Sequence, residues 1–202
     1  MKKLFCAVIA ALCVLFSGFS HAAKQPNLKE IYLGNKDAPV TMQEFASLTC
    51  SHCADFTVNV LPELKKKYID TGKMRYIYRD FPIDGIALKA AALAHCMPDE
   101  QYYAFLDVLS KNQQQWAFGS SPERTLLQYA KTGGLAEEKA ASCIKDPDKL
   151  DALVALRTEA QNKYDIDSTP TFIFNEGKEK IKGAMKVEDF SKVIDKLLEQ
   201  KK

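Results

Sequence analysis

The chain has 202 residues, of which 28 are Lys or Arg and 26 are Asp or Glu, giving a formal net charge of +2 at pH 7. Positive and negative residues are almost equal in number, which does not favour nucleic acid or an anionic membrane surface as a partner.

The N-terminus has the layout of a secretory signal peptide: two lysines at residues 2–3, an apolar run of 13 residues from Leu4 to Phe16, then small residues. The apolar run is shorter than the roughly 20 residues of a membrane span, although an uncleaved anchor remains the alternative. Cleavage after Ala22 or Ala23 is expected, with residues 1–22 as the signal. Export to the periplasm follows, where disulfides persist.

Apolar periodicity and turn residues predict an order of elements along the remaining residues 23–202. We expect strands at residues 30–34, 40–47 and 73–80, a helix from about residue 50 that Pro62 kinks or restarts, helices near 84–97, 99–115, 122–131, 135–145 and 147–164, strands at 169–175 and 179–183, and an amphipathic helix at 187–200.

Two small α/β parts therefore flank a block of helices. Residues 23–82 and 165–202 are each too small to bury their own sheet face, so we expect them to share one sheet, with residues 83–164 as an all-helical insertion. The mature length is enough for one well-formed core.

The segment "EFASLTCSHCADF" holds two cysteines, Cys50 and Cys53, between a predicted strand and the start of a helix. A Cys-x-x-Cys pair is typical of a redox couple, half of a zinc site or a structural clip. At a helix start, free N–H groups and the helix dipole would stabilise a thiolate at Cys50 and lower its pKa. Cys50 is thus predicted as the exposed attacking sulfur and Cys53 as the buried resolving one.

His52 lies inside this pair and would favour the reduced form by hydrogen bonding or by charge, unless it is only an exposed loop residue. A metal site is disfavoured. The adjacent His95 and Cys96 cannot readily point at one ion from a helix, and a zinc site needs a second pair of ligands at short spacing.

With "STPTFIFN" downstream and the C-terminal amphipathic helix, the chain resembles the DsbA-type thiol-disulfide oxidoreductases of the thioredoxin superfamily over its whole mature length. The resemblance implies an α/β thioredoxin fold, a central mixed sheet flanked by helices, with an inserted all-helical subdomain. It also implies a strongly lowered pKa of the first cysteine and an oxidising couple.

The resemblance assigns further site residues. Cys50 and Cys53 match the redox-active disulfide, and Thr169 and Pro170 match a cis-proline loop that faces it and touches substrate. A trans Pro170 at an ordinary strand start is the alternative. Glu44 matches a buried acid that manages the proton of the resolving cysteine. The alternative is that alternation along the strand places the Glu44 side chain on the solvent face.

Two positions depart from the best-known member of the family. Ser51 stands where Pro is familiar, and Thr169 where Val is familiar. Both lie at the predicted redox centre and bear on the strength of the oxidant.

Cys96 and Cys143 both fall in the helical block. Cys96 is predicted to share a helix face with Leu88 and Ala92. Two separate buried thiols are one interpretation, and a structural disulfide between two helices is the one we favour in an oxidising compartment.

The sequence thus predicts a monomeric periplasmic dithiol oxidase without a bound cofactor, acting on reduced or unfolded exported proteins. The resemblance implies reoxidation by a DsbB-like membrane quinone reductase. The alternatives are a disulfide isomerase or reductase on the same fold, and a non-catalytic binding protein for exported peptides. The isomerases of the family carry an N-terminal dimerisation domain, for which the residues before the first predicted strand are too few.

Overall fold

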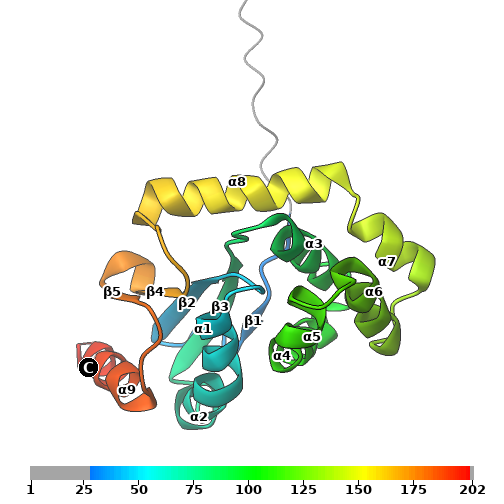
Figure 1. Cartoon of the computed structure of the whole chain (residues 1–202). Helices are drawn as coiled ribbons and strands as arrows, with labels where there is room; N and C mark the ends of the chain where they lie inside the picture. Colours follow the sequence, from blue (N-terminus) through cyan, green and yellow to red (C-terminus); the bar gives the residue numbers. More distant parts are fainter. Residues whose placement is uncertain (1–27, 201–202) are drawn as a thin grey trace, which may run out of the picture.

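One mixed sheet forms the centre of the protein in a computed structural model that describes residues 28–200 (Figure 1). Its strands are β1 (Tyr32–Leu33), β2 (Val40–Ala46), β3 (Met74–Asp80), β4 (Thr171–Phe174) and β5 (Glu179–Lys182), in the spatial order β1-β3-β2-β4-β5. β2 and β3 run parallel, and the other neighbours are antiparallel. The parts before and after the helical block therefore share one sheet, as predicted.

A helical stretch follows β2 on one face of the sheet. It consists of α1 (Ser51–Asp55), a π-helical turn (Phe56–Val60), α2 (Leu61–Leu64) and a second π-helical turn (Lys65–Ile69). Pro62 is the second residue of α2, which follows the first π-helical turn directly. Because proline has no N–H for the i−4 carbonyl, this wider turn lets the helical path continue without a break.

The C-terminal helix α9 (Val187–Glu199) covers the same sheet face. Three rings meet there: Phe56 lies 4.6 Å from Phe172 and 5.3 Å from Phe190, measured between ring centroids. All three residues are fully buried. This contact joins the helical stretch that follows β2, the strand β4 and the helix α9 into one core.

The long helix α8 (Pro147–Tyr164) crosses above the sheet in Figure 1 and packs on its other face. Phe45, Ala160 and Ile173 belong to a separate buried cluster there. Neighbouring residues of a strand point to opposite faces, so Phe45 faces α8 whereas Glu44 faces Cys50 and Cys53.

Besides α8, the helical segment over residues 83–164 comprises α3 (Gly85–Ala94), a 3-10 turn (Asp99–Gln101), α4 (Tyr102–Lys111), α5 (Gln113–Ala117), α6 (Pro122–Thr132) and α7 (Glu137–Cys143). The predicted helix over 99–115 is wrong as a single element. Asn112 leaves the helical conformation, and the chain turns there so that Trp116 is fully buried and donates through Nε1 to the carbonyl of Leu109 at 2.7 Å.

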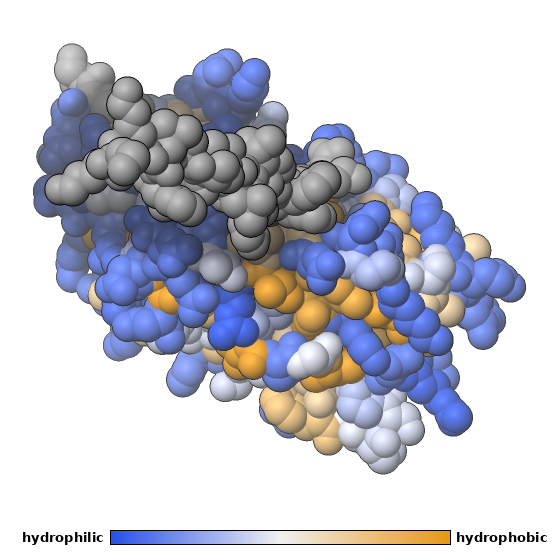
Figure 2. Space-filling view, turned by 90° about the horizontal axis from the view of Figure 1, so that it is seen from above, coloured by the Kyte–Doolittle hydropathy of each residue, from blue (hydrophilic) through white to orange (hydrophobic). Residues whose placement is uncertain are grey.

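The surface seen from above is mostly polar, and apolar residues gather in one central area of it (Figure 2). Of the helices within residues 28–200, none combines the length and the apolar character that a membrane span requires. The predicted signal peptide lies outside the described residues.

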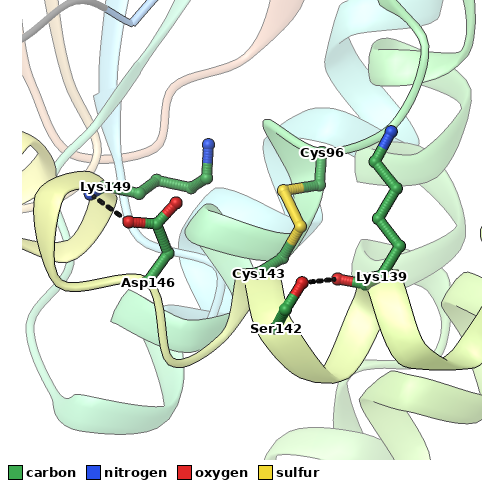
Figure 3. Close-up of a disulfide and its surroundings, with 6 residues drawn as sticks. All are labelled: Cys96, Lys139, Ser142, Cys143, Asp146 and Lys149. Atoms are coloured by element: carbon green, nitrogen blue, oxygen red, sulfur yellow. Dashed lines mark hydrogen bonds between the residues drawn. A yellow bond between two sulfur atoms is a disulfide. The ribbon is translucent and has the colours of Figure 1, made fainter.

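A disulfide joins Cys96 to Cys143, with 6.4 Å between the two Cα atoms (Figure 3). The prediction that Cys96 lies on a helix face is wrong, because α3 ends at Ala94 and His95 is no longer helical. Cys96 instead lies in the following turn and reaches the last residue of α7. The bond therefore fastens a turn to a helix end rather than two helix faces to each other.

Candidate active site

Residues 47–53 form the turn that carries the cysteine pair, here named the redox turn. Cys50 is extended and forms the N-cap of α1, and its sulfur accepts a hydrogen bond from the Cys53 N–H at 3.4 Å. Both cysteines are free thiols. The sulfur therefore occupies the place where a helix has unpaired N–H groups and partial positive charge.

The exposed fraction of Cys50 is only 9%, and that of Cys53 is 3%. Cys50 is therefore not the exposed sulfur that the sequence predicted. The reason is the chain before β4, which closes over the redox turn and brings the Thr169 carbonyl oxygen to 3.5 Å from the Cys50 sulfur.

The environment lowers the pKa of the Cys50 thiol to about 5. The largest cause is a hydrogen bond from the Cys53 thiol, which favours the thiolate; burial opposes it, and the Thr169 side chain and the backbone N–H groups of Cys53 and His52 lower the pKa further. The Thr169 carbonyl oxygen acts the other way, because it accepts only from the protonated thiol. The donors prevail, since they outnumber this single acceptor.

The peptide bond between Thr169 and Pro170 is cis. The loop that holds this bond faces the redox turn, and Gly183 donates through its N–H to the Pro170 carbonyl at 2.8 Å, which ties the loop to the end of β5. Thr169 is thus placed directly beside the Cys50 sulfur.

Glu44 is completely buried, so the alternative of a solvent-facing side chain is wrong. It lies on β2 below the pair, and burial raises its pKa to about 8, against the effect of a hydrogen bond from the Tyr76 hydroxyl. Burial also raises the pKa of Cys53 far above its ordinary value, and the Cys50 hydrogen bond and the charge of Glu44 add to this. The two sulfurs therefore differ strongly in acidity.

His52 is exposed, and its backbone N–H is the part of it that stabilises the Cys50 thiolate. The predicted hydrogen bond from the imidazole to the thiolate is not formed in this arrangement. Any effect of the ring would have to be exerted by its charge when it is protonated.

The sequence alone did not identify two anchors of the redox turn. Gln113 is buried and donates through Nε2 to the carbonyl oxygens of Leu48 and Cys50 at 2.8 and 3.0 Å. Asp84 caps α3 by accepting from the Ala87 N–H at 2.7 Å, and its other oxygen accepts from the Thr49 hydroxyl at 2.6 Å. The signature of an N-cap could have indicated Asp84, whereas no local signal marks Gln113.

Metal-binding residue types do not form a cluster of three or more anywhere within residues 28–200. The chemistry that the site offers is that of two thiols of unlike acidity beside a buried carboxyl group.

Comparisons with known proteins agree with this arrangement. A Rickettsia felis protein named as a protein-disulfide oxidoreductase is 32% identical over 174 residues, which are 86% of this chain. This chain spans only 62% of the length of that relative. The crystal structure of alpha-DsbA1 from Wolbachia pipientis has 39% identity and a TM-score of 0.78, and the match covers 85% of this chain and 92% of that chain.

BdbD from Bacillus subtilis in its oxidised form has a TM-score of 0.73 at 24% identity, with 87% of this chain and 96% of that chain covered, and so supports the fold. The fold and the redox turn define a protein of the thioredoxin class. A model of the thioredoxin family matches residues 26–196. The chain belongs to this family and, as its similarity to alpha-DsbA1 shows, to the DsbA-type thiol-disulfide oxidoreductases within it.

Proposed function

We propose that this protein is a periplasmic dithiol oxidase, which donates a disulfide between Cys50 and Cys53 to newly exported proteins. The proposal rests on one arrangement: the Cys50 sulfur caps α1 and is surrounded by donors that stabilise its thiolate. Stabilising the thiolate favours the reduced protein, so its disulfide form is readily reduced and acts as an oxidant.

In the proposed reaction a client thiolate attacks the Cys50 sulfur of the Cys50–Cys53 disulfide. The bond between the two cysteines breaks, and Cys53 leaves and takes up a proton. The second client thiolate then attacks the client sulfur of the mixed disulfide, and Cys50 leaves as a thiolate. Two electrons pass from client to protein and stay on sulfur, so no bound cofactor is required.

The other site residues have distinct proposed roles. Glu44 supplies and accepts the proton of Cys53, because it is a buried acid whose pKa lies near neutrality. Thr169 and Pro170 bind the client backbone across the redox turn. His52 favours the thiolate of Cys50 through its N–H and its charge.

The proposed partners are reduced or unfolded exported proteins, and a membrane quinone reductase of the DsbB type for reoxidation. The protein acts as a monomer.

The test is the reduction potential of the Cys50–Cys53 couple, measured with the oxidation of a reduced two-cysteine peptide. We expect a potential well above the value of about −270 mV of a thioredoxin-type reductant, and rapid oxidation of the peptide. A potential near −270 mV with efficient reduction of insulin would instead favour the reductase or isomerase. Peptide binding with no thiol exchange would favour a non-catalytic binding protein.

A further inference from the structure

The two oxygens of the buried Glu44 carboxyl group have different surroundings. Oε2 accepts a hydrogen bond from the Tyr76 hydroxyl of β3, whereas Oε1 is buried and has no hydrogen-bond partner among residues 28–200. Glu44 is 0% exposed and Tyr76 is 1% exposed. Leaving a buried acceptor unpaired costs free energy, so such groups in native proteins call for an explanation.

The titratable groups that act on this carboxyl group come from three elements. They are Tyr76 and Tyr78 of β3, Tyr103 of α4, and the two thiols of the redox turn. The Tyr76 hydroxyl lowers the pKa of Glu44, while burial and the charge of Cys50 raise it. Burial and Glu44 together raise the pKa of Tyr76 well above its ordinary value, so this phenol keeps its proton and acts only as a donor toward the carboxylate.

We propose that Tyr76 is a positioning residue for proton transfer at Cys53: its hydroxyl holds Oε2 of Glu44 and leaves Oε1 free to exchange a proton with the Cys53 sulfur. The inference rests on the proposed function, because it concerns the step in which Cys53 leaves or attacks a mixed disulfide.

In the direction of reoxidation, the S–H bond of Cys53 breaks and its proton passes to Oε1 of Glu44. The electron pair left on the Cys53 sulfur forms the bond to the Cys50 sulfur, and the partner thiol leaves as a thiolate. In the direction of client oxidation, the proton returns from Oε1 to Cys53.

A neutral donor suits this task better than a cation would. A buried lysine beside Glu44 would hold the carboxylate permanently ionised, whereas a phenol stabilises it by one hydrogen bond only. The carboxyl group can then both accept and release a proton near neutral pH, which a general acid and base requires.

The experiment follows the resolving step directly. Reduced full-length protein is mixed with excess oxidised glutathione, so that the mixed disulfide at Cys50 forms rapidly, and the concentration-independent phase reports attack by Cys53. Between pH 6 and pH 10 the low pKa of Cys50 keeps its thiolate population constant. We expect the rate of the native protein to rise with pH, with a midpoint near 8.

Three variants distinguish positioning from a structural role. Tyr76→Phe should slow the step about tenfold at pH 7 and move the midpoint up by about one unit, because the carboxylate loses its donor. 3-Fluorotyrosine at position 76 keeps the ring and the hydroxyl but is a stronger donor, so it should move the midpoint down. Tyr68→Phe is the matched control: Tyr68 is equally buried and donates to Asp195 at 2.9 Å, away from the redox turn, and the profile should not change.

Glu44→Gln should remove the midpoint, and Tyr76→Phe should add no further loss in that background, because Tyr76 acts through Glu44. Three outcomes would each overturn the inference. The pH–rate profile of Tyr76→Phe could be unchanged, or Tyr76→Phe could slow the step as much in the Glu44→Gln background as in the native protein. The third is a shift of the pH midpoint in the same direction in both position-76 variants. If Tyr76→Phe does not fold, the 3-fluorotyrosine protein decides alone, and the absence of a downward shift overturns it. The proposed function fails separately, by a low reduction potential in the native protein.

Discussion

Gln113, the first residue of α5, donates through Nε2 to the carbonyl oxygen of Cys50 at 3.0 Å and also holds the Leu48 carbonyl at 2.8 Å. A residue of the helical insertion thus fixes the backbone on both sides of Thr49. The insertion contributes directly to the geometry of the redox turn.

Replacing Gln113 by Met should lower the free energy of unfolding by roughly 1–3 kcal/mol, because two buried carbonyl oxygens lose a donor. Denaturant unfolding measures the loss, and a thiolate absorbance titration should show a changed pKa of Cys50. Gln115→Met is the control on the same helix, since the Gln115 side chain is exposed and accepts from the Tyr129 hydroxyl. Equal losses in the two variants would argue against a special role for Gln113.

The two redox cysteines should respond differently to substitution. Cys50→Ser should abolish dithiol oxidation because the attacked sulfur is gone. Cys53→Ser should instead accumulate mixed disulfides with clients, visible on non-reducing gels, because the resolving thiol is missing. Trapping by Cys50→Ser rather than by Cys53→Ser would reverse the assigned roles.

The low pKa of Cys50 predicts how the stability of the reduced protein depends on pH. The folded pKa of about 5 lies below the unfolded value of about 8.5, so the stabilisation is complete above pH 8.5 and disappears as pH falls through 5. At pH 7 it should amount to roughly 2–3 kcal/mol. The disulfide form has no thiolate, so the reduced protein should lose stability relative to the oxidised one between pH 7 and pH 4.

Paired denaturation of the reduced and oxidised proteins at pH 7 and pH 4 measures this difference. A difference that does not change with pH, with a Cys50 titration near 8.5, would contradict the mechanism. His52→Ala keeps the backbone N–H and removes the ring. It should narrow the difference and weaken the oxidant, yet leave the pKa of Cys50 below its ordinary value.

The disulfide of the insertion should stabilise the protein without taking part in exchange. Its cysteines are 47 residues apart, for which the chain-entropy model gives about 4 kcal/mol as an upper figure. Replacing Cys96 and Cys143 by Ala should therefore lower the thermal midpoint and leave dithiol oxidation largely intact. Free thiols at both positions, seen by mass spectrometry of non-reduced peptides, would contradict this interpretation.

The order of strands and helices was predictable because apolar periodicity is a local property of the chain. Phe190, Ile194 and Leu197 define the buried face of α9 from their spacing alone. The division of the helix over 99–115 was not predictable, because it depends on the buried position of Trp116 and on its hydrogen bond to the Leu109 carbonyl oxygen. The early end of α3 at Ala94 likewise has no breaker before Pro98.

The redox pair and its place at a helix start were also local features and could be read from the sequence. The limited exposure of Cys50 could not, because the covering loop at Thr169 comes from a distant part of the chain. Tyr76 and Gln113 were missed for the same reason. A tyrosine in a strand and a glutamine in a helix carry no local sign of what they contact.

The sheet has a consequence for the order in which the protein becomes functional. β4 pairs with β2 and carries the loop beside Cys50, but it is synthesised after the whole helical insertion. Until the last strands emerge, the redox turn lacks its cover, and both of its thiols are open to Cys96 and Cys143 of the same nascent chain. Maturation of this protein should therefore depend on its own C-terminal segment arriving before Cys50, Cys53, Cys96 and Cys143 pair at random, and a chain stalled before Thr171 should accumulate mispaired disulfides.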